Sequence, residues 1–243
     1  MDPKSVAVLI PCYNEELTIG QVIDDFRAEL PYADIYVYDN NSTDNSAQIA
    51  AEHAAFVVKA PIQGKGAVVQ QMFSEVDADW YVMVDADNTY PAGLVHDMLF
   101  GASRFECPMV IGDRLSSNYY EDNKRHFHGF GNALVKILVN LLYHGQAVDL
   151  ETGRIQRVTD IMTGYRVFSR RFVKEVKFTS AGFEIETEMT IRALQGGYRI
   201  GTIPVVYRDR PEGSCSKLST FSDGRKVLHT IFSMWHKPYK ITA

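Results

Sequence analysis

The sequence predicts an α/β fold in which helices cover both faces of a mostly parallel central sheet. As far as Pro91, short apolar runs alternate with segments whose apolar residues have helical spacing. The apolar runs are continuous, as in parallel strands that are buried on both faces. A hydrophobic content of 46% and a charged content of 23% provide for a packed core. With no internal repeat or linker, we expect one domain over residues 1–243.

Each expected element rests on a local pattern. The first helix, for example, places Ile19, Val22, Ile23 and Phe26 on one side. Beyond Pro91 the alternation weakens, although the segment "MVIGDR" indicates one more strand. Crossovers between the parallel strands should be right-handed. The expected strands are Val6–Ile10, Ile35–Tyr38, Phe56–Val58 and Trp80–Val84, and the expected helices are Leu17–Leu30, Asp44–His53 and Ala67–Val76.

Composition and charge exclude several classes of function. A formal net charge of −5 argues against a general nucleic-acid-binding protein. The three cysteines, Cys12, Cys107 and Cys215, are odd in number and lack metal-ligand spacing, which favours a reduced, cytoplasmic setting. The N-terminal segment "MDPKSVAVLIPCYNEE" does not have the pattern of a signal peptide. No apolar stretch has the roughly 18 residues typical of a membrane-spanning helix.

Polar residues gather where the expected strands end. The first strand is followed by "PCYNEE", the second by "DNNSTDNS" and the fourth by "DADNTYP". Ligands of open α/β sheets bind beyond the carboxyl ends of the strands. If these strands are parallel neighbours, their polar ends converge at one edge. The alternative is that Asn, Asp and Ser form turns there and cap the following helices.

Asp85 and Asp87 form the most informative pair. Alternation along a strand sends residues i and i+2 to the same side, and the small Ala86 leaves room between them. Two close carboxylates repel each other unless a cation or a shared proton relieves the repulsion. Mg²⁺ or Mn²⁺ prefers carboxylate oxygens and often keeps a substrate phosphate as a further ligand. The pair therefore predicts a metal that holds a diphosphate, although one D-x-D alone is a weak motif.

Other nucleotide-binding motifs are missing or incomplete. No G-x-G-x-x-G follows the first strand, which argues against a dinucleotide-binding domain. Gly64, Lys65 and Gly66 lack the spacing of a P-loop and its Ser or Thr after the Lys. The glycines still allow a loop to lie close to a ligand, with Lys65 near a phosphate. A solvated loop before a helix is the alternative interpretation.

Eight segments together resemble the family 2 glycosyltransferases, which have the GT-A fold. The later segments are most similar to the dolichol-phosphate mannose synthase-like branch, which makes polyprenyl-phosphate sugars. The resemblance implies a nucleotide-sugar-binding half over about residues 1–105 and an acceptor half over about residues 106–243. The segments are "IPCYNEE", "YDNNSTDNS", "QGKGA", "MVDADNTYP", "IGDR", "TGYRVFSRRF", "GFEIETEMTIRA" and "RPEGSCSKLST".

The resemblance also assigns residues to the donor. Asp85 would lie near the ribose and the metal, and Asp87 would be the main metal ligand. Many members have two adjacent acids where this chain has Asp39 and Asn40, which leaves the contacts to the base open. Asp44 would support the loop after the second strand. The expected donor-binding residues are Pro11, Tyr13, Glu15, Asp39, Lys65, Asp85, Ala86 and Asp87, with Asp85 and Asp87 as metal ligands and Asn88 or Thr89 as a further oxygen donor.

The acceptor half offers Asp160 as the family's candidate catalytic carboxylate. A phosphate acceptor is already ionised at neutral pH and needs little help from a base, so Asp160 could instead orient a substrate or cap a helix; a hydroxyl acceptor needs proton removal. Glu188 would point inward, whereas a solvated face is an alternative for Glu184 and Glu186. By resemblance and by their charge, the expected acceptor-binding residues are Arg114, Arg125, Thr163, Gly164, Arg166, Glu188 and Arg208.

Basic residues late in the chain fit a reaction between two phosphate groups. Arginine binds phosphate through two donors and lysine acts as a point charge. A cation and a basic cluster would allow a donor diphosphate and a lipid phosphate to lie close together. We therefore expect four catalytic residues: Asp87, Asp160, Arg210 and Lys217. For a single arginine, a surface salt bridge is the more common role.

Two helices have the amphipathic pattern of a membrane-interface segment. They cover residues 127–144 and 221–237, and basic and histidine side chains flank their apolar sides. The first would be about 26 Å long, short for a hydrocarbon core of about 30 Å. We expect peripheral contact with an anionic membrane surface at the cytoplasmic face. Ordinary packing onto the domain is the alternative for both helices.

These inferences combine into one hypothesis. The chain is expected to be an inverting, Mg²⁺- or Mn²⁺-dependent glycosyltransferase that moves a sugar from a UDP- or GDP-sugar to a polyprenyl phosphate. One alternative keeps the chemistry and changes the acceptor to a saccharide or protein hydroxyl. Another is a non-catalytic nucleotide-sugar-binding protein, against which the acidic pair and Asp160 speak. A sugar nucleotidyltransferase would need a basic, glycine-rich segment where "PCYNEE" is acidic.

Overall fold

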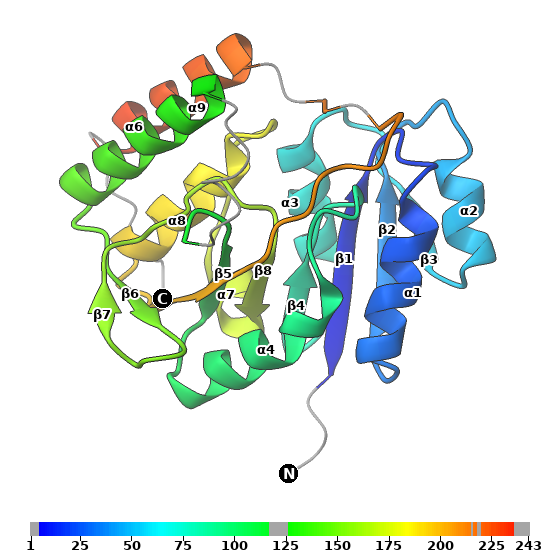
Figure 1. Cartoon of the computed structure of the whole chain (residues 1–243), viewed down its shortest axis with the longest axis horizontal. Coiled ribbons are helices and arrows are strands. Elements are labelled where there is room, and N and C mark those ends of the chain that lie inside the picture. The colour runs from blue at the N-terminus through cyan, green and yellow to red at the C-terminus, as the bar shows by residue number, and fades with distance from the viewer. Residues whose placement is uncertain (1–4, 117–125, 215, 218–219, 236–243) are drawn as a thin grey trace.

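A computed structural model describes residues 5–116, 126–214, 216–217 and 220–235 of the chain. Its strands form one sheet in the order β3-β2-β1-β4-β8-β5-β9-β6-β7 (Figure 1). The strands are β1 Val6–Cys12, β2 Asp34–Asp39, β3 Phe56–Lys59, β4 Trp80–Met83, β5 Met109–Asp113, β6 Ala147–Asp149, β7 Ile155–Gln156, β8 Arg166–Ser169 and β9 Ile200–Pro204. The helices are α1 Ile19–Glu29, α2 Ser46–Glu52, α3 Lys65–Glu75, η1 Ala92–Leu94, α4 Val95–Arg104, α6 His126–Leu142, α7 Arg170–Glu175, α8 Ile185–Gln195 and α9 Thr220–Trp235.

The sheet is mostly parallel, as predicted. Strands β1 to β4 run parallel to one another, and β5, β9 and β6 continue in the same direction. The exceptions are β7, which is antiparallel to β6, and β8, which lies antiparallel between β4 and β5. In the β8 ladder, Trp80 faces Ser169 and Met109 faces Phe168. The sequence indicated a sheet of this kind but not the reversed strand in its middle.

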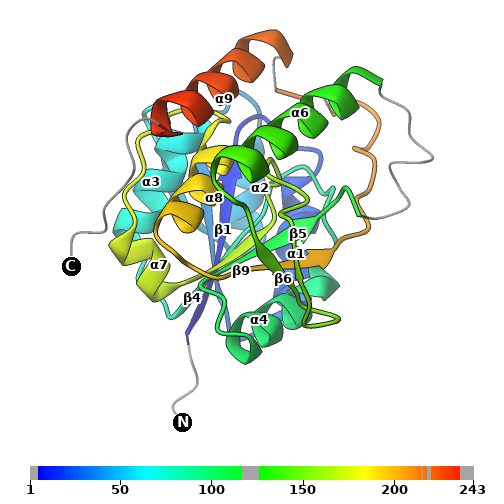
Figure 2. The same ribbon diagram turned by 90° about the vertical axis from the view of Figure 1, so that its left-hand side faces the viewer.

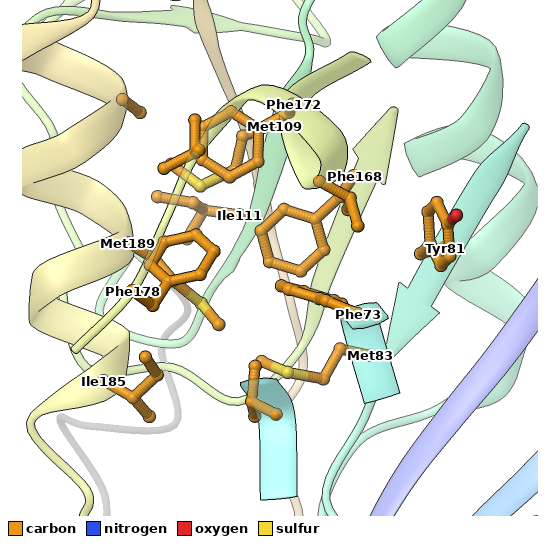
Figure 3. Close-up of a cluster of buried hydrophobic side chains, with 14 of the residues drawn as sticks. Phe73, Tyr81, Met83, Met109, Ile111, Phe168, Phe172, Phe178, Ile185 and Met189 are labelled. Atoms are coloured by element: carbon orange, nitrogen blue, oxygen red, sulfur yellow. The ribbon is translucent and has the colours of Figure 1, made fainter. Parts of the chain in front are cut away.

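Helices cover both faces of the sheet, which confirms the expected layers. Helices α1, α2 and α4 lie on one face and α3, α7 and α8 on the other, as Figures 1 and 2 show together. On the second face, aromatic and methionine side chains form the core shown in Figure 3, among them Phe73, Phe168 and Met189. Phe168 stacks on Phe172 with ring centroids 5.6 Å apart. This rigid core fixes α8 against the strands that lead to the site.

The polar ends of the strands converge as predicted. In the register of β1 and β2, Cys12 lies beside Asp39, and the backbone N–H of Val84 donates to the carbonyl of Leu9 at 3.2 Å. The carboxyl ends of β1, β2 and β4 are therefore adjacent. Because β8 is reversed, the loop that precedes it also arrives at this edge. The candidate site is built where these segments meet.

The start of α3 differs from the expectation by two residues. The helix begins at Lys65, because the two glycines around it allow close backbone contact with another loop. A Cβ atom at Gly64 would lie 2.3 Å from the carbonyl oxygen of Ala181, and one at Gly66 would lie 2.1 Å from that of Ser180. Gly64 also has a φ of +129°, which disfavours other residues. Lys65 is thereby held at the junction of the two halves of the chain.

The two amphipathic helices, α6 and α9, lie next to each other beyond α8 (Figure 2). Each packs one apolar side against the domain, through Val135 and Val139 in α6 and residues such as Ile231 in α9. Each also leaves apolar side chains exposed, such as Leu141 and Trp235. In the part of the chain that the structure describes, no helix has the length and apolar character needed to cross a bilayer.

Candidate active site

The expected nucleoside-binding residues meet at the ends of β1 and β2. Pro11 and Asp39 lie at adjacent strand ends, and the side chain of Tyr13 is partly exposed just beyond β1. Asp44 supports this region, since its carboxylate accepts hydrogen bonds from the backbone N–H groups of Ser46 at 3.0 Å and Glu16 at 3.2 Å. The loops after β1 and β2 thus hold each other in place.

Asn40 connects this region to the loop that carries Lys65. Its side chain is only 4% exposed. The amide Nδ2 donates to the carbonyls of Ala60 and Ile62, both at 2.8 Å, and Oδ1 accepts from the Gln63 side chain at 3.1 Å and from the Gly64 backbone at 2.8 Å. An acid here would lack the two donors. The turn before Lys65 therefore requires the amide of Asn40, at the position where many family members have a second acid.

Lys65 lies between two carboxylates from different parts of the chain. Its Nζ is 2.5 Å from Asp85 Oδ1 and 2.6 Å from Glu186 Oε1, and its side chain is 10% exposed. Burial acts to lower the pKa of Lys65, but the charges of Asp85 and Glu186 outweigh it and raise the pKa above its ordinary value. The lysine is therefore a permanent cation at the end of β4, rather than part of a solvated loop.

Gly164 provides the space for Asp85. A Cβ atom at this position would lie 2.2 Å from Asp85 Oδ2, closer than real contacts allow. The loop is held by Tyr90, whose hydroxyl accepts from the Gly164 backbone N–H at 3.1 Å and lies 3.2 Å from Thr163 Oγ1. The loop before β8 and the acids after β4 are thus packed directly on each other.

Asp87 lies in a tight turn after β4 rather than on the strand itself. Its Oδ1 accepts from the hydroxyl of Thr89 at 2.6 Å and from the Thr89 backbone at 3.2 Å, while its Oδ2 contacts the Arg210 guanidinium. Burial and the nearby Asp85 charge raise the pKa of Asp87, and Arg210 opposes that shift. Asn88 and Thr89 were the expected further oxygen donors. The hydroxyl of Thr89 is already bonded to Asp87, and Asn88 lines a groove beside α1.

Glu15 collects the basic residues that follow β9. Arg210 Nη1 is 3.1 Å and Lys217 Nζ is 2.7 Å from Glu15 Oε1. Ala86 is buried in the same region, and its carbonyl accepts from the Thr18 hydroxyl at 2.7 Å. Figure 1 shows the segment after β9, in orange, crossing to the upper ends of β4 and β1. This segment brings Arg210 and Lys217 to the acids of the donor region.

The buried Asp160 forms a two-pronged ion pair with Arg114, whose side chain is 14% exposed. Arg114 Nε is 2.7 Å from Asp160 Oδ2 and its Nη2 is 3.0 Å from Oδ1. Asp160 is 1% exposed and also accepts from the backbone N–H of Met162 at 3.2 Å. The guanidinium lies 5.6 Å from the ring centre of Tyr207. Asp160 therefore orients Arg114, and both of its oxygens are engaged.

Two expected acceptor residues lie in the interior. Arg166 is fully buried and donates to the carbonyls of Thr163 at 3.0 Å and Ile161 at 2.7 Å and to the hydroxyl of Thr190 at 3.0 Å. Burial lowers the pKa of its guanidinium to about 10, so it stays charged at neutral pH. Thr163 is also fully buried. Both shape the loop before β8 from below, which corrects the expectation of direct contact with an acceptor.

The three glutamates around the start of α8 are all buried, so a solvated face is wrong for Glu184 and Glu186. Glu188 points inward but toward a different loop: it accepts from the backbone N–H groups of Thr179 at 3.0 Å and Ser180 at 2.7 Å. Burial acts to raise the pKa of Glu188, but these bonds outweigh it and the pKa is lowered. Glu188 thus holds a loop, and Glu186 is the carboxylate at the site.

The remaining basic candidates lie elsewhere. Arg208 lines the groove beside α1 together with Asp25 and Glu29, and its backbone N–H donates to the carbonyl of Thr89 at 2.8 Å. It therefore does not lie with Arg114 and Asp160. Arg125 lies outside the residues that the structure describes. Of the expected acceptor-binding set, the structure brings Arg114 and Gly164 to the site.

Sequence reasoning missed Glu186, Tyr90 and Tyr207. Glu186 was given a solvated helix face as an alternative and no role in the site, and Ile185, Met189 and Ile191 around the glutamates were the signal that this helix is buried. Tyr90 and Tyr207 have ring centres 5.2 Å apart, although they are distant in the sequence. No local pattern predicts such a pair.

Known proteins resemble the chain, two of them over most of its length. Glycosyltransferase AglJ of Haloferax volcanii is 33% identical over 231 residues, which cover 95% of this chain and 72% of that protein. A dolichyl-phosphate hexose transferase of the same organism is 27% identical over 93% of this chain and 92% of its own length. Protein RfbJ of Shigella flexneri is 50% identical over 110 residues, which cover 45% of this chain and 85% of RfbJ.

Solved structures show the same fold. Glucosyl-3-phosphoglycerate synthase from Mycobacterium tuberculosis superposes with a TM-score of 0.72 at 21% identity, over 98% of this chain and 82% of that one. The sheet with its reversed strand is therefore a GT-A fold. The model of the family "Glycosyl transferase family 2" matches residues 7–176. By this match over more than half of its residues, the chain belongs to glycosyltransferase family 2.

Proposed function

We propose that the chain is an inverting, divalent-metal-dependent enzyme that transfers a sugar from a UDP- or GDP-sugar to a polyprenyl phosphate. The observation that carries this proposal is the pair of acids after β4. Asp85 and Asp87 follow β4 at the carboxyl edge of the sheet. Asp85 is paired with Lys65, and Asp87 is paired with Arg210. In open α/β sheets, ligands bind beyond the carboxyl ends of the strands, where these two acids lie.

The residues at this turn fit a hard divalent cation. In the described ranges, no three His, Cys, Asp or Glu side chains gather with metal-binding geometry. Mg²⁺ commonly takes one or two protein carboxylates and completes its shell with water and substrate phosphate. Asp85 and Asp87 would hold the ion, which would offset the charge that develops on the departing diphosphate. The complex of glucosyl-3-phosphoglycerate synthase with Mn²⁺ and UDP supports this assignment, which leaves open which ion is used.

The donor's nucleoside would occupy the adjacent strand ends. Pro11, Tyr13 and Asp39 line this region, and Tyr13 offers a partly exposed ring for stacking. The diphosphate would then lie near the acids after β4 and within reach of Arg210 and Lys217. Because both side chains are already held at this edge, little ordering entropy remains to be lost when they bind phosphate.

The Arg114–Asp160 pair supports a phosphate acceptor. Since both oxygens of Asp160 are engaged, the carboxylate is poorly placed to remove a proton from a hydroxyl. An ionised phosphate needs no such step. Its oxygen would form a bond to the anomeric carbon as the bond from that carbon to the donor diphosphate breaks, on the opposite face of the sugar. Arg114, beside Tyr207, would attract the acceptor's charge.

The lipid part of the proposed acceptor is supported by a relative and by the surface of two helices. Relatives include a dolichyl-phosphate hexose transferase, which favours a polyprenyl phosphate. Helices α6 and α9 expose apolar side chains, and α9 also exposes three basic or histidine side chains, a combination suited to an anionic membrane surface. We therefore propose peripheral membrane contact. The exposed residues are Ile137, Leu141, Phe232 and Trp235, with Arg225, Lys226 and His229.

The test uses purified protein, Mn²⁺ or Mg²⁺, a panel of labelled UDP- and GDP-sugars and undecaprenyl phosphate in mixed micelles. The expected result is a lipid-linked sugar from at least one donor. Asp87→Ala should lose at least about a hundredfold of this activity while remaining folded. Asp97→Ala, at an exposed position in α4, is the matched control and should be as active as the wild type. Transfer to a soluble saccharide with no lipid product would contradict the acceptor.

A further inference from the structure

Arg210 already occupies the position at which a metal would neutralise Asp87. Its guanidinium forks between Asp87 and Glu15, and Ser214 Oγ lies 3.2 Å from Nη1. Asp87 is 3% exposed, so the bond is shielded from solvent. Two neighbouring carboxylates after β4 need positive charge between or beside them. Arg210 supplies that charge at Asp87 and Lys65 supplies it at Asp85.

The segment that carries Arg210 is anchored close by, so the side chain can change partner over a short distance. The backbone N–H of Val205 donates to the carbonyl of Asp113 at 2.9 Å, and that of Arg208 donates to Thr89 at 2.8 Å. These bonds fix the chain two residues before Arg210. Beyond it, Lys217 binds the carbonyl of Asn14 and the carboxylate of Glu15, both at 2.7 Å.

The charges of the site favour joint entry of a metal and a donor. Among the residues that the structure describes, ion pairs join four carboxylates to three cations, and these seven groups together carry one net negative charge. A divalent ion alone would displace Arg210 from Asp87 and leave the guanidinium without that partner. A nucleotide sugar alone would add two phosphate charges to a site that is already negative. The two together add no net charge, and the phosphates offer Arg210 a new partner. The four carboxylates are those of Glu15, Asp85, Asp87 and Glu186, and the cations are Lys65, Arg210 and Lys217.

From these contacts, and on the basis of the proposed function, we propose that Arg210 couples metal binding to donor binding. It competes with the divalent ion for Asp87 while the donor is absent, and it moves from Asp87 to the diphosphate when ion and donor enter together. Arg210 is then an inhibitor of metal binding in one state and a ligand of the donor in the other. The nucleotide and the metal each raise the other's affinity, as reciprocity of coupled binding requires.

The test measures free Mn²⁺ by electron paramagnetic resonance while the protein is titrated, alone and with saturating UDP or GDP. In the wild type, one of the nucleotides should tighten Mn²⁺ binding by about tenfold or more. Arg210→Gln should bind Mn²⁺ more tightly than the wild type when no nucleotide is present, and more weakly than the wild type when it is. A residue that merely supports the fold, or merely binds phosphate, would not produce the gain in the first condition.

Two further variants make the result decisive. Arg199→Gln removes the same charge from an exposed site just before β9 and should match the wild type in both conditions. Arg210→Lys keeps the charge without the fork, so its coupling should be intermediate, which protects the test if Arg210→Gln folds poorly. Suppose that the wild type binds Mn²⁺ with a nucleotide, but Arg210→Gln without a nucleotide binds Mn²⁺ no more tightly than the wild type does. That result overturns the coupling by Arg210 and leaves the proposed function standing. If no condition gives Mn²⁺ binding to the wild type, both this proposal and the proposed function fail.

Discussion

Replacing Asn40 by aspartate should destabilise the turn that carries Lys65. The substitution keeps the size of the side chain and removes both N–H donors. The carbonyls of Ala60 and Ile62 would lose their partners and face a carboxylate instead. The bonds that Oδ1 accepts from Gln63 and Gly64 would remain and become charge-assisted.

The magnitude follows from these four bonds. Each buried acceptor left without a donor costs about 1–3 kcal/mol, whereas each bond that gains charge recovers less than about 1 kcal/mol. The expected net loss is about 2–3 kcal/mol in the free energy of unfolding. For a chain of this size that corresponds to a fall in Tm of about 4–12 °C.

Thermal unfolding followed by circular dichroism measures this change, with Asn41→Asp as the matched control. Asn41 is the next residue along and donates from an exposed position to Pro61 and Gln63, both at 3.2 Å, so its variant should stay within about 0.5 kcal/mol of the wild type. Burial should raise the pKa of the new carboxyl at position 40. The stability of Asn40→Asp should then be partly restored in acid, where the protonated group donates again, and be lost as pH rises through that pKa.

Equal melting temperatures for the Asn40→Asp and Asn41→Asp variants would refute this reasoning. So would a difference that does not narrow in acid, because the missing donor is the proposed cause. The rate of sugar transfer gives a second measurement, since the turn positions Lys65 beside Asp85. Donor KM should rise in Asn40→Asp more than acceptor KM does.

Three further substitutions test the surrounding contacts. Gly164→Ala places a methyl group against Asp85 and should weaken Mn²⁺ binding by about tenfold, measured by titration, at an overpacking cost of about 1–3 kcal/mol; unchanged Mn²⁺ affinity would contradict the packing. Asp160→Asn leaves the mostly buried Arg114 without its charge partner and should lower the free energy of unfolding, measured in urea, by about 3 kcal/mol. A loss no larger than that from breaking an exposed ion pair would contradict this assignment. The pKa of Glu188 is lowered in the fold, so its ionised form adds stability above its ordinary pKa of 4.5, and this is lost as pH falls through the lowered value. Glu188→Gln should therefore be less stable than the wild type at pH 7 and nearly equal to it in strong acid, as urea unfolding at both pH values will measure.

Much of the fold could be predicted because its signals are local. The continuous apolar runs before Pro91 and the helical spacing between them fixed the elements of the first half, and the polar strand ends fixed the edge at which the site lies. Asp85 and Asp87 were identified because an acidic pair directly after a buried strand is unusual. These patterns depend on residues that are neighbours in the chain.

The partners of the charged residues could not be predicted. Lys65 meets Glu186 across 121 residues of sequence, and nothing local connects them. Arg166 follows a loop with polar residues and resembles a ligand in sequence, yet it is fully buried beneath that loop. The direction of β8 was also hidden, because a strand of four residues with only two apolar side chains, Val167 and Phe168, is compatible with either orientation in a sheet. Long-range packing decides each of these features.

The reversed strand β8 has a consequence for how such a protein can diversify. Its four residues are held on both sides by β4 and β5, so their position does not depend on the length of chain that leads to them. Between Tyr143 and Thr159, the turns on either side of β6 and β7 can therefore change in length while Asp85 and Asp87 stay where they are. Sequence change in this connection is thereby separated from the geometry of the acids after β4.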